Sequence, residues 1–147
     1  GIATEAGYTD VRFEDLQISH NSDGGIDNKA QATCANVTSA HNRRNFKLWY
    51  GITCDGPVTS IDPDEPGTDT AVHFYLVGRP DGSSVYHFSH VNVISETPAP
   101  IFVNARPDTA ITLIVDSCSI RTPGGTPLVV DPEHKITLKL GPGCTVG

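Results

Sequence analysis

Residues 72–93 read VHFYLVGRPDGSSVYHFSHVNV, and this stretch decides the predicted fold. Two runs in which apolar and polar residues alternate flank residues 79–83. The Asp-Gly pair inside this turn is a strong signal for a tight β-hairpin. With that pair as the loop, three cross-strand contacts follow: Val77 with Tyr86, Tyr75 with Phe88, and His73 with His90.

The same two-residue alternation recurs along the chain, and a 3.6-residue helical period is nearly absent. Strands are expected at residues 11–18, 30–36, 45–54, 71–78, 84–95, 101–105, 110–120, 127–130 and 135–140. A slip at Glu14 and Asp15 fits a β-bulge, and the glycine-rich residues 21–25 suit the turn of a first hairpin. Residues 39–44 form a short helical turn at most, and residues 55–69, rich in Pro and Asp, are expected to be an exposed loop.

No helical segment separates the expected strands, so helical crossovers and a parallel sheet are not expected. The prediction is an all-β protein, an antiparallel β-sandwich or a small β-barrel stapled by two disulfides. The 147 residues fit one domain, residues 1–147, and show no internal repeat.

The net charge of −7, from 17 acidic and 10 basic residues, argues against nucleic acid or an anionic membrane surface as a partner. No stretch approaches the roughly 20 apolar residues that a membrane-spanning helix needs, so membrane insertion is not expected. The sequence specifies no oligomeric state.

The four cysteines, Cys34, Cys54, Cys118 and Cys144, predict structural disulfides rather than a metal site or a redox pair. Three connectivities are open, and proximity along the chain favours 34 with 54 and 118 with 144. Each bridge would contribute about 3 kcal/mol. Together with a glycosylation sequon at Asn36, the cysteines indicate a secreted, extracellular protein. The first residue is Gly rather than Met, consistent with a removed leader.

Candidate catalytic and metal-binding residues do not converge. His73 and His90 could approach across the predicted hairpin, but a third ligand would have to come from elsewhere, and a solvated histidine pair is the alternative. The acidic loops do not match a calcium-binding loop. No nucleophile, base or pair of carboxylates stands out, so no enzyme activity, metal or cofactor is expected.

An aromatic strand face is the main candidate for binding. It combines Trp49 and Tyr50 with the outer face of the predicted hairpin, which carries Tyr75, Tyr86, Phe88, His73 and His90. Aromatic side chains offer a large contact area to sugar rings or to a protein partner. The alternative is that these side chains fill a core between two sheets.

The layout resembles that of fungal secreted elicitors of the hypersensitive response and the related Alternaria major-allergen-like β-barrel family. The features that carry the resemblance are Cys34 and Cys54, the aromatic pair Trp49-Tyr50 before the second cysteine, and a second bridge near the C-terminus. The resemblance implies an extracellular protein without enzymatic activity that plants perceive as a trigger of defence and cell death.

Two functions are therefore expected from the sequence. The first is a non-enzymatic elicitor or effector that binds a host protein or cell-surface component and triggers plant defence. The second is a carbohydrate-binding module that uses the aromatic strand face to hold a glycan.

Overall fold

The computed structural model describes residues 1–64 and 70–147, and in this part of the chain every regular element is a β-strand. The strands of these residues are β1 (Ile2–Ala3), β2 (Val11–Ser19), β3 (Gly24–Asn28), β4 (Ala32–Ala40), β5 (Arg44–Trp49), β6 (Ile52–Ile61), β7 (Val72–Val77), β8 (Ser83–Ile94), β9 (Phe102–Asn104), β10 (Ala110–Arg121), β11 (Val129–Val130) and β12 (Ile136–Val146).

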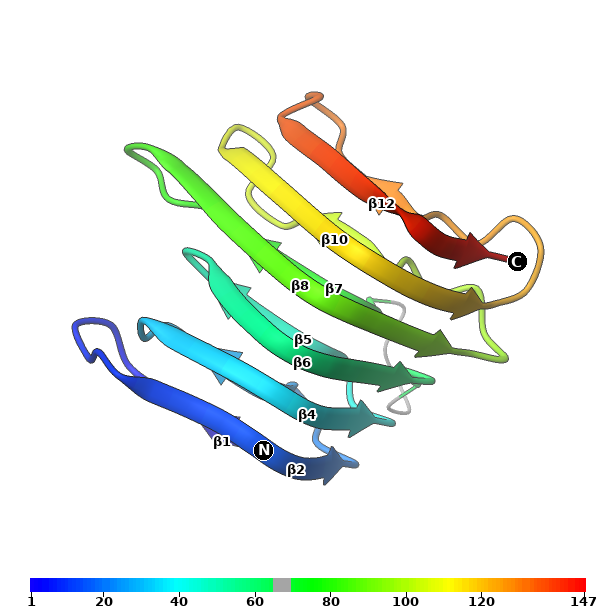
Figure 1. The fold of residues 1–147 in the computed structure, drawn as a ribbon, viewed down its shortest axis with the longest axis horizontal. Helices are drawn as coiled ribbons and strands as arrows, with labels where there is room; N and C mark the ends of the chain where they lie inside the picture. The colour runs from blue at the N-terminus through cyan, green and yellow to red at the C-terminus, as the bar shows by residue number, and fades with distance from the viewer. Residues whose placement is uncertain (65–69) are drawn as a thin grey trace.

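The strands form two sheets, and both are entirely parallel. One sheet, called here the odd sheet, has the order β1-β3-β5-β7-β9-β11, and the other, the even sheet, has the order β12-β10-β8-β6-β4-β2. Figure 1 shows the even strands side by side, all pointing the same way, with the odd strands behind them. The predicted antiparallel sandwich or barrel is therefore wrong, although the all-β class is right.

Consecutive strands alternate between the two sheets, so one even strand and one odd strand make one coil of a parallel β-solenoid. The usual rule is that parallel strands need a crossover of a dozen or more residues, most often a helix. Here the strand of the opposite sheet provides that crossover. The absence of helical periodicity therefore did not exclude parallel sheets.

The predicted hairpins do not form, because each strand pairs with the equivalent strand of the next coil and not with its neighbour in the sequence. β7 and β8 lie in different sheets, so the expected contacts between Tyr75 and Phe88 and between His73 and His90 do not form as cross-strand pairs. Phe88 instead pairs in register with Cys54 on β6 and Val115 on β10. The first predicted hairpin fails in the same way, because β3 begins at Gly24, inside the expected turn, and belongs to the odd sheet, whereas β2 belongs to the even sheet.

Most predicted strands exist, but their bounds shift. Tyr50 and Gly51 separate β5 from β6, and β6 runs on to Ile61 through residues expected to be loop. Residues 65–69 of that expected loop lie outside the described part of the chain. β4 continues to Ala40, where a helical turn was considered. The β-bulge expected at Glu14 and Asp15 is absent, because the pairing of β2 with β4 continues past Asp15 without a register shift; Asp15 instead has left-handed backbone with φ of 54°.

The core lies between the sheets and contains a column of stacked rings. Phe46, Phe74 and Phe102 occupy equivalent positions on β5, β7 and β9 and are almost fully buried. Their ring centroids are 4.8 and 5.0 Å apart. Ile26 continues the column on one side and Val129 on the other. Parallel in-register strands place equivalent residues directly above one another, so a repeated phenylalanine forms a stack.

Both disulfides join consecutive coils of the even sheet. Cys34 bonds Cys54 between β4 and β6, and Cys118 bonds Cys144 between β10 and β12. In each pair the two cysteines are register partners with Cα atoms 4.3 Å apart. The pairing favoured by proximity is therefore confirmed.

Candidate binding site

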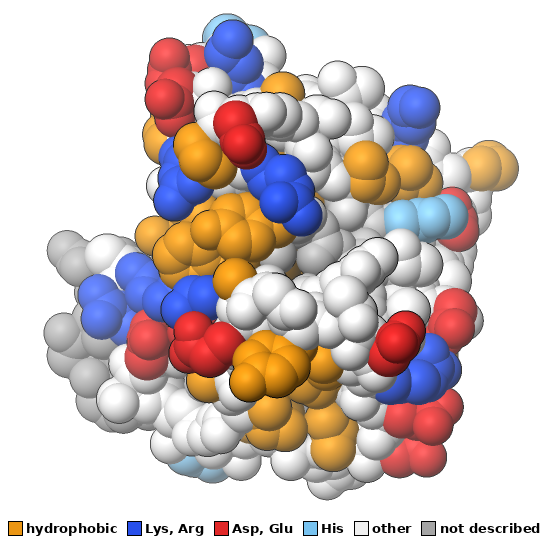
Figure 2. Space-filling model, turned by 90° about the vertical axis from the view of Figure 1, so that its left-hand side faces the viewer, with side chains coloured by type: hydrophobic (Ala, Val, Ile, Leu, Met, Phe, Trp, Pro, Cys, Tyr) orange, Lys and Arg blue, Asp and Glu red, His pale blue; other side chains and the backbone are white. Residues whose placement is uncertain are grey.

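A hollow of about 890 Å³ lies along the edge where odd strands turn into even strands. Its lining comes from the N-terminal residues 6–12 and from the turns that follow β3, β5 and β7. These turns contribute residues 29–33, residues 49–53, and Arg79 with Val85. Figure 2 looks onto this edge and shows apolar side chains bordered by Lys and Arg atoms.

Trp49 and Tyr50 sit at the turn from β5 to β6, and both line the hollow. The turn is sharp because Tyr50 and Gly51 have φ of 70° and 113°, a left-handed region that glycine adopts without strain. A Cβ on Gly51 would lie only 2.5 Å from the carbonyl oxygen of Val85. The two aromatic rings meet edge to face, with centroids 5.9 Å apart.

Asp27 orients the Trp49 ring. The indole Nε1 donates a hydrogen bond of 2.9 Å to Asp27 Oδ1, and the other Asp27 oxygen lies 3.7 Å from Lys47 Nζ. A half-buried indole held by its N–H keeps a defined orientation. The part of the ring that remains exposed in the hollow offers apolar contact area.

Cations surround the aromatic pair. Lys29 Nζ lies 5.1 Å from the centroid of the Trp49 ring, and Lys47 Nζ and Arg106 Cζ lie 5.7 and 5.9 Å from it. The Arg79 guanidinium lies 5.0 Å from the Tyr50 ring. These distances are typical of cation–π contacts. The site therefore combines aromatic surface with positive charge in a chain that is acidic overall.

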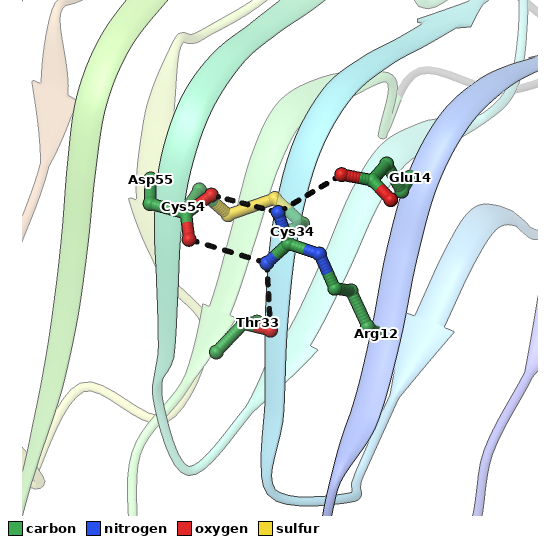
Figure 3. Close-up of a disulfide and its surroundings, with 6 residues drawn as sticks. All are labelled: Arg12, Glu14, Thr33, Cys34, Cys54 and Asp55. Atoms are coloured by element: carbon green, nitrogen blue, oxygen red, sulfur yellow. Dashed lines mark hydrogen bonds and ion pairs between the residues drawn. A yellow bond between two sulfur atoms is a disulfide. The ribbon is translucent and has the colours of Figure 1, made fainter.

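A further cation of the lining, Arg12, is occupied by carboxylates. Figure 3 shows its guanidinium reaching from β2 across Thr33 to Asp55 on β6, where two nitrogens contact both carboxylate oxygens at 3.0 and 3.2 Å. Glu14 lies 3.1 Å from the same guanidinium. The hydrogen bonds from Arg12 hold the pKa of Asp55 below its ordinary value. Arg12 thus ties three strands together beside the disulfide between Cys34 and Cys54.

The structure divides the predicted binding residues. Trp49 and Tyr50 come together in the hollow. Tyr86 and Phe88 are buried in the core, where the Tyr86 hydroxyl contacts the carbonyl oxygens of Leu48 and Val77 at 2.9 Å. Burial raises the pKa of Tyr86. For Tyr86 and Phe88, the alternative of a core between two sheets is the correct one.

Tyr75 and His90 are only partly buried, but neither lines the hollow. Tyr75 lies on the odd sheet with the Arg44 guanidinium 4.2 Å from its ring. His90 lies on the even sheet, where Nδ1 contacts Ser117 Oγ at 2.5 Å and Nε2 contacts Asn92 Oδ1 at 2.8 Å. The predicted common face of these residues does not exist.

His73 belongs to a buried polar network between the sheets. Its Nδ1 lies 2.7 Å from Ser60 Oγ, which accepts a hydrogen bond from Asn45 Nδ2. The other ring nitrogen, Nε2, has no hydrogen-bond partner among the described residues. Burial lowers the pKa of His73 to about 4.

Metal binding finds no support in residues 1–64 and 70–147, where no group of three or more His, Cys, Asp or Glu side chains is placed to hold an ion. The histidines His20 and His41 stack on each other with ring centroids 5.2 Å apart, and His41 Nδ1 lies 2.9 Å from Asp64. His20, His41 and Asp64, which follow β2, β4 and β6, thus form a cluster held by ring stacking and one hydrogen bond.

Sequence reasoning missed the cations of the site, and the coil period is the signal that could have found them. Cys34 and Cys54 are 20 residues apart because they occupy equivalent positions in consecutive coils. Lys29 precedes Trp49 by the same spacing. A short repeat, His20-Asn21 and His41-Asn42, marks a period of 21 residues at the opposite turns.

Comparison with protein-family profiles, characterised proteins and solved structures found no match to this chain. Within the described residues, the structure contains no helix that could span a bilayer. Function must therefore be argued from the site itself.

Proposed function

We propose that this is an exported protein that binds a glycan in the hollow around Trp49 and Tyr50, without catalysing a reaction. The observation that carries the proposal is the partly exposed aromatic pair in a concave surface of about 890 Å³. Concave sites with aromatic walls and a few polar groups suit small ligands. Sugar rings present flat apolar faces that pack against such walls.

Export is supported by two features. Two disulfides are present, and such bonds persist mainly in oxidising compartments. The sequon residue Asn36 is exposed on the even sheet, where its Nδ2 donates a 2.8 Å hydrogen bond to Asp15. An oligosaccharide on Asn36 would point into solvent.

The second candidate function is an elicitor or effector that contacts a host protein and triggers plant defence, as the fungal resemblance implies. The observation in its favour is exposed apolar surface in the lining of the hollow, where Tyr8 and Val85 are 66% and 48% exposed. Exposed apolar side chains beside an aromatic hollow provide the anchors that protein partners use.

Binding to a panel of plant and fungal oligosaccharides, followed by calorimetry, tests the first proposal. Trp49→Ala should weaken glycan binding by about tenfold or more, equivalent to about 1.4 kcal/mol. Tyr75→Ala is the matched control, because Tyr75 is a partly buried aromatic residue outside the hollow. Thermal unfolding of each variant confirms that the fold is retained.

The outcomes separate the two candidates. Glycan binding that depends on Trp49 but not on Tyr75 supports the first. Cell death in infiltrated leaf tissue that is lost with Tyr8→Ala, without binding to any glycan of the panel, supports the elicitor instead. Equal glycan affinity of Trp49→Ala and the native protein would contradict a site in this hollow.

A further inference from the structure

We infer that the ligand of the hollow is an acidic glycan, one whose sugar rings carry carboxylate or sulfate groups. This inference rests on the proposed glycan-binding function and adds the chemical class of the ligand. It is carried by two cations that lie against the aromatic pair and have no carboxylate partner among the described residues.

Lys29 and Arg79 are these two cations. Both line the hollow, Lys29 against the Trp49 ring at 5.1 Å and Arg79 against the Tyr50 ring at 5.0 Å. Within the described residues, neither makes an ion pair at 4.0 Å or less. Their charges are therefore available to a ligand.

The other cations near the site are engaged. Lys47 lies between Asp23 and Asp27 at 3.5 and 3.7 Å, and Arg12 holds Glu14 and Asp55. Arg106 donates a 3.0 Å hydrogen bond to the carbonyl oxygen of Gly78. Among the described cations that line the hollow, Arg12 is held by carboxylates, whereas Lys29 and Arg79 are not.

Charge in the lining also favours an anionic ligand. Among the described residues that line the hollow, Asp10 is the only carboxylate, against Lys29, Arg79 and the paired Arg12. Lysine and arginine side chains donate hydrogen bonds and accept none. A ligand rich in anionic acceptor oxygens satisfies these donors, and charge-assisted hydrogen bonds are about twice as strong as neutral ones.

The aromatic rings and the cations can act on one sugar residue. Lys29 and Arg79 lie over the Trp49 and Tyr50 rings, so a sugar that contacts either ring brings its acidic group close to an ammonium or a guanidinium. A nucleic acid would need more cations than these two, because its affinity comes from neutralising many phosphates. A short acidic oligosaccharide suits the site better.

Calorimetry with the full chain and one matched pair of probes tests the inference: an oligogalacturonate and the same oligosaccharide as its methyl ester, which removes the charge and keeps the rings. The acid should bind about tenfold or more tightly than the ester. Raising NaCl from about 50 to about 500 mM should weaken binding of the acid and leave binding of the ester unchanged. A sulfated oligosaccharide of the same length shows whether sulfate replaces carboxylate.

Two double variants locate the effect. Lys29→Gln with Arg79→Gln should abolish the preference for the acid and retain the weaker binding of the ester. Arg121→Gln with Lys139→Gln removes the same charge from residues that do not line the hollow, and should preserve the preference. Thermal unfolding checks both variants for folding.

Failure of the inference is distinguishable from failure of the proposed function. Equal binding of acid and ester, lost in Trp49→Ala, would overturn the acidic ligand and keep the glycan site. Binding of neither probe, with no other glycan bound, would overturn both. Tighter binding of a single-stranded oligonucleotide than of the acid would assign the two cations to nucleic acid and overturn the inference.

Discussion

His73 is the residue that links the stability of the fold most directly to pH. Its ring is fully buried, shares a hydrogen bond with Ser60 at Nδ1, and has its pKa lowered to about 4 by burial. The unfolded chain binds a proton near pH 6.5, whereas the folded chain does not. The stability due to neutral His73 is therefore complete above pH 6.5 and is lost as the pH falls toward 4.

His73→Gln should flatten this pH dependence. Between pH 7 and pH 5 the native protein should lose about 2 kcal/mol of unfolding free energy through His73, and the variant should lose much less. Denaturant unfolding at the two pH values measures the difference, with the exposed His134→Gln as the control. The account of His73 is contradicted by an equal loss in His73→Gln and the native protein.

The predicted binding residues show which features of single residues could be inferred from the sequence. Trp49 and Tyr50 were recognised by type, and they do line the hollow. Tyr86 and Phe88 have the same type and are buried, because their strand faces the core from the even sheet and not from a hairpin. Side-chain chemistry thus identified binding candidates, but only the strand arrangement could separate surface from core.

Among the elements, strand β12 has a special position at the edge of the even sheet. Its inward residues Leu138 and Leu140 are 37% and 39% exposed, whereas their register partners Leu113 and Val115 on β10 are nearly fully buried. With a neighbour on one side only, β12 has fewer contacts to hold it in place. The disulfide between β10 and β12 supplies the missing constraint.

Replacing both Cys118 and Cys144 by Ala should release β12 before the rest of the sheet. The native bridge closes a 26-residue loop, and a loop of this size is worth about 3 kcal/mol. Amide hydrogen exchange of residues 136–146 should accelerate strongly, while β4 and β6 keep their protection. Removing Cys34 and Cys54 provides the matched control, because β4 and β6 have neighbours on both sides.

Unchanged protection of residues 136–146 in the first variant would contradict the role given to this bridge. Equal acceleration in both variants would contradict it as well. In either case the two bridges would act on the whole fold instead of on one edge strand.

At the scale of the whole molecule, the alternation of residues predicted most strands but not their direction. Alternation reports that a strand has one buried face, and this holds in parallel and antiparallel sheets alike. The Asp-Gly turn at residues 81–82 pointed to a hairpin, yet β7 and β8 leave that turn into different sheets. A repeat of one coil along the sequence would have predicted parallel strands. The length of this repeat varies from coil to coil, so it was not recognised.

The coil lengths explain why the repeat escaped notice. One coil separates Cys34 from Cys54 by 20 residues, and another separates Cys118 from Cys144 by 26. An insertion between β6 and β7 lengthens a third coil. A repeat with a variable period and few shared residues leaves only a weak trace in one sequence. The disulfides were the clearest trace, because each joins equivalent positions of consecutive coils.

The central claim is that consecutive coils stack as parallel strands in two sheets, and nuclear Overhauser contacts in the isotope-labelled protein test it most directly. The structure requires contacts of parallel geometry from Val58 to Val91 and from Val91 to Cys118, all within the even sheet. Close contacts between the α protons of facing residues on β7 and β8, such as Tyr75 and Phe88, would indicate an antiparallel hairpin and contradict the claim.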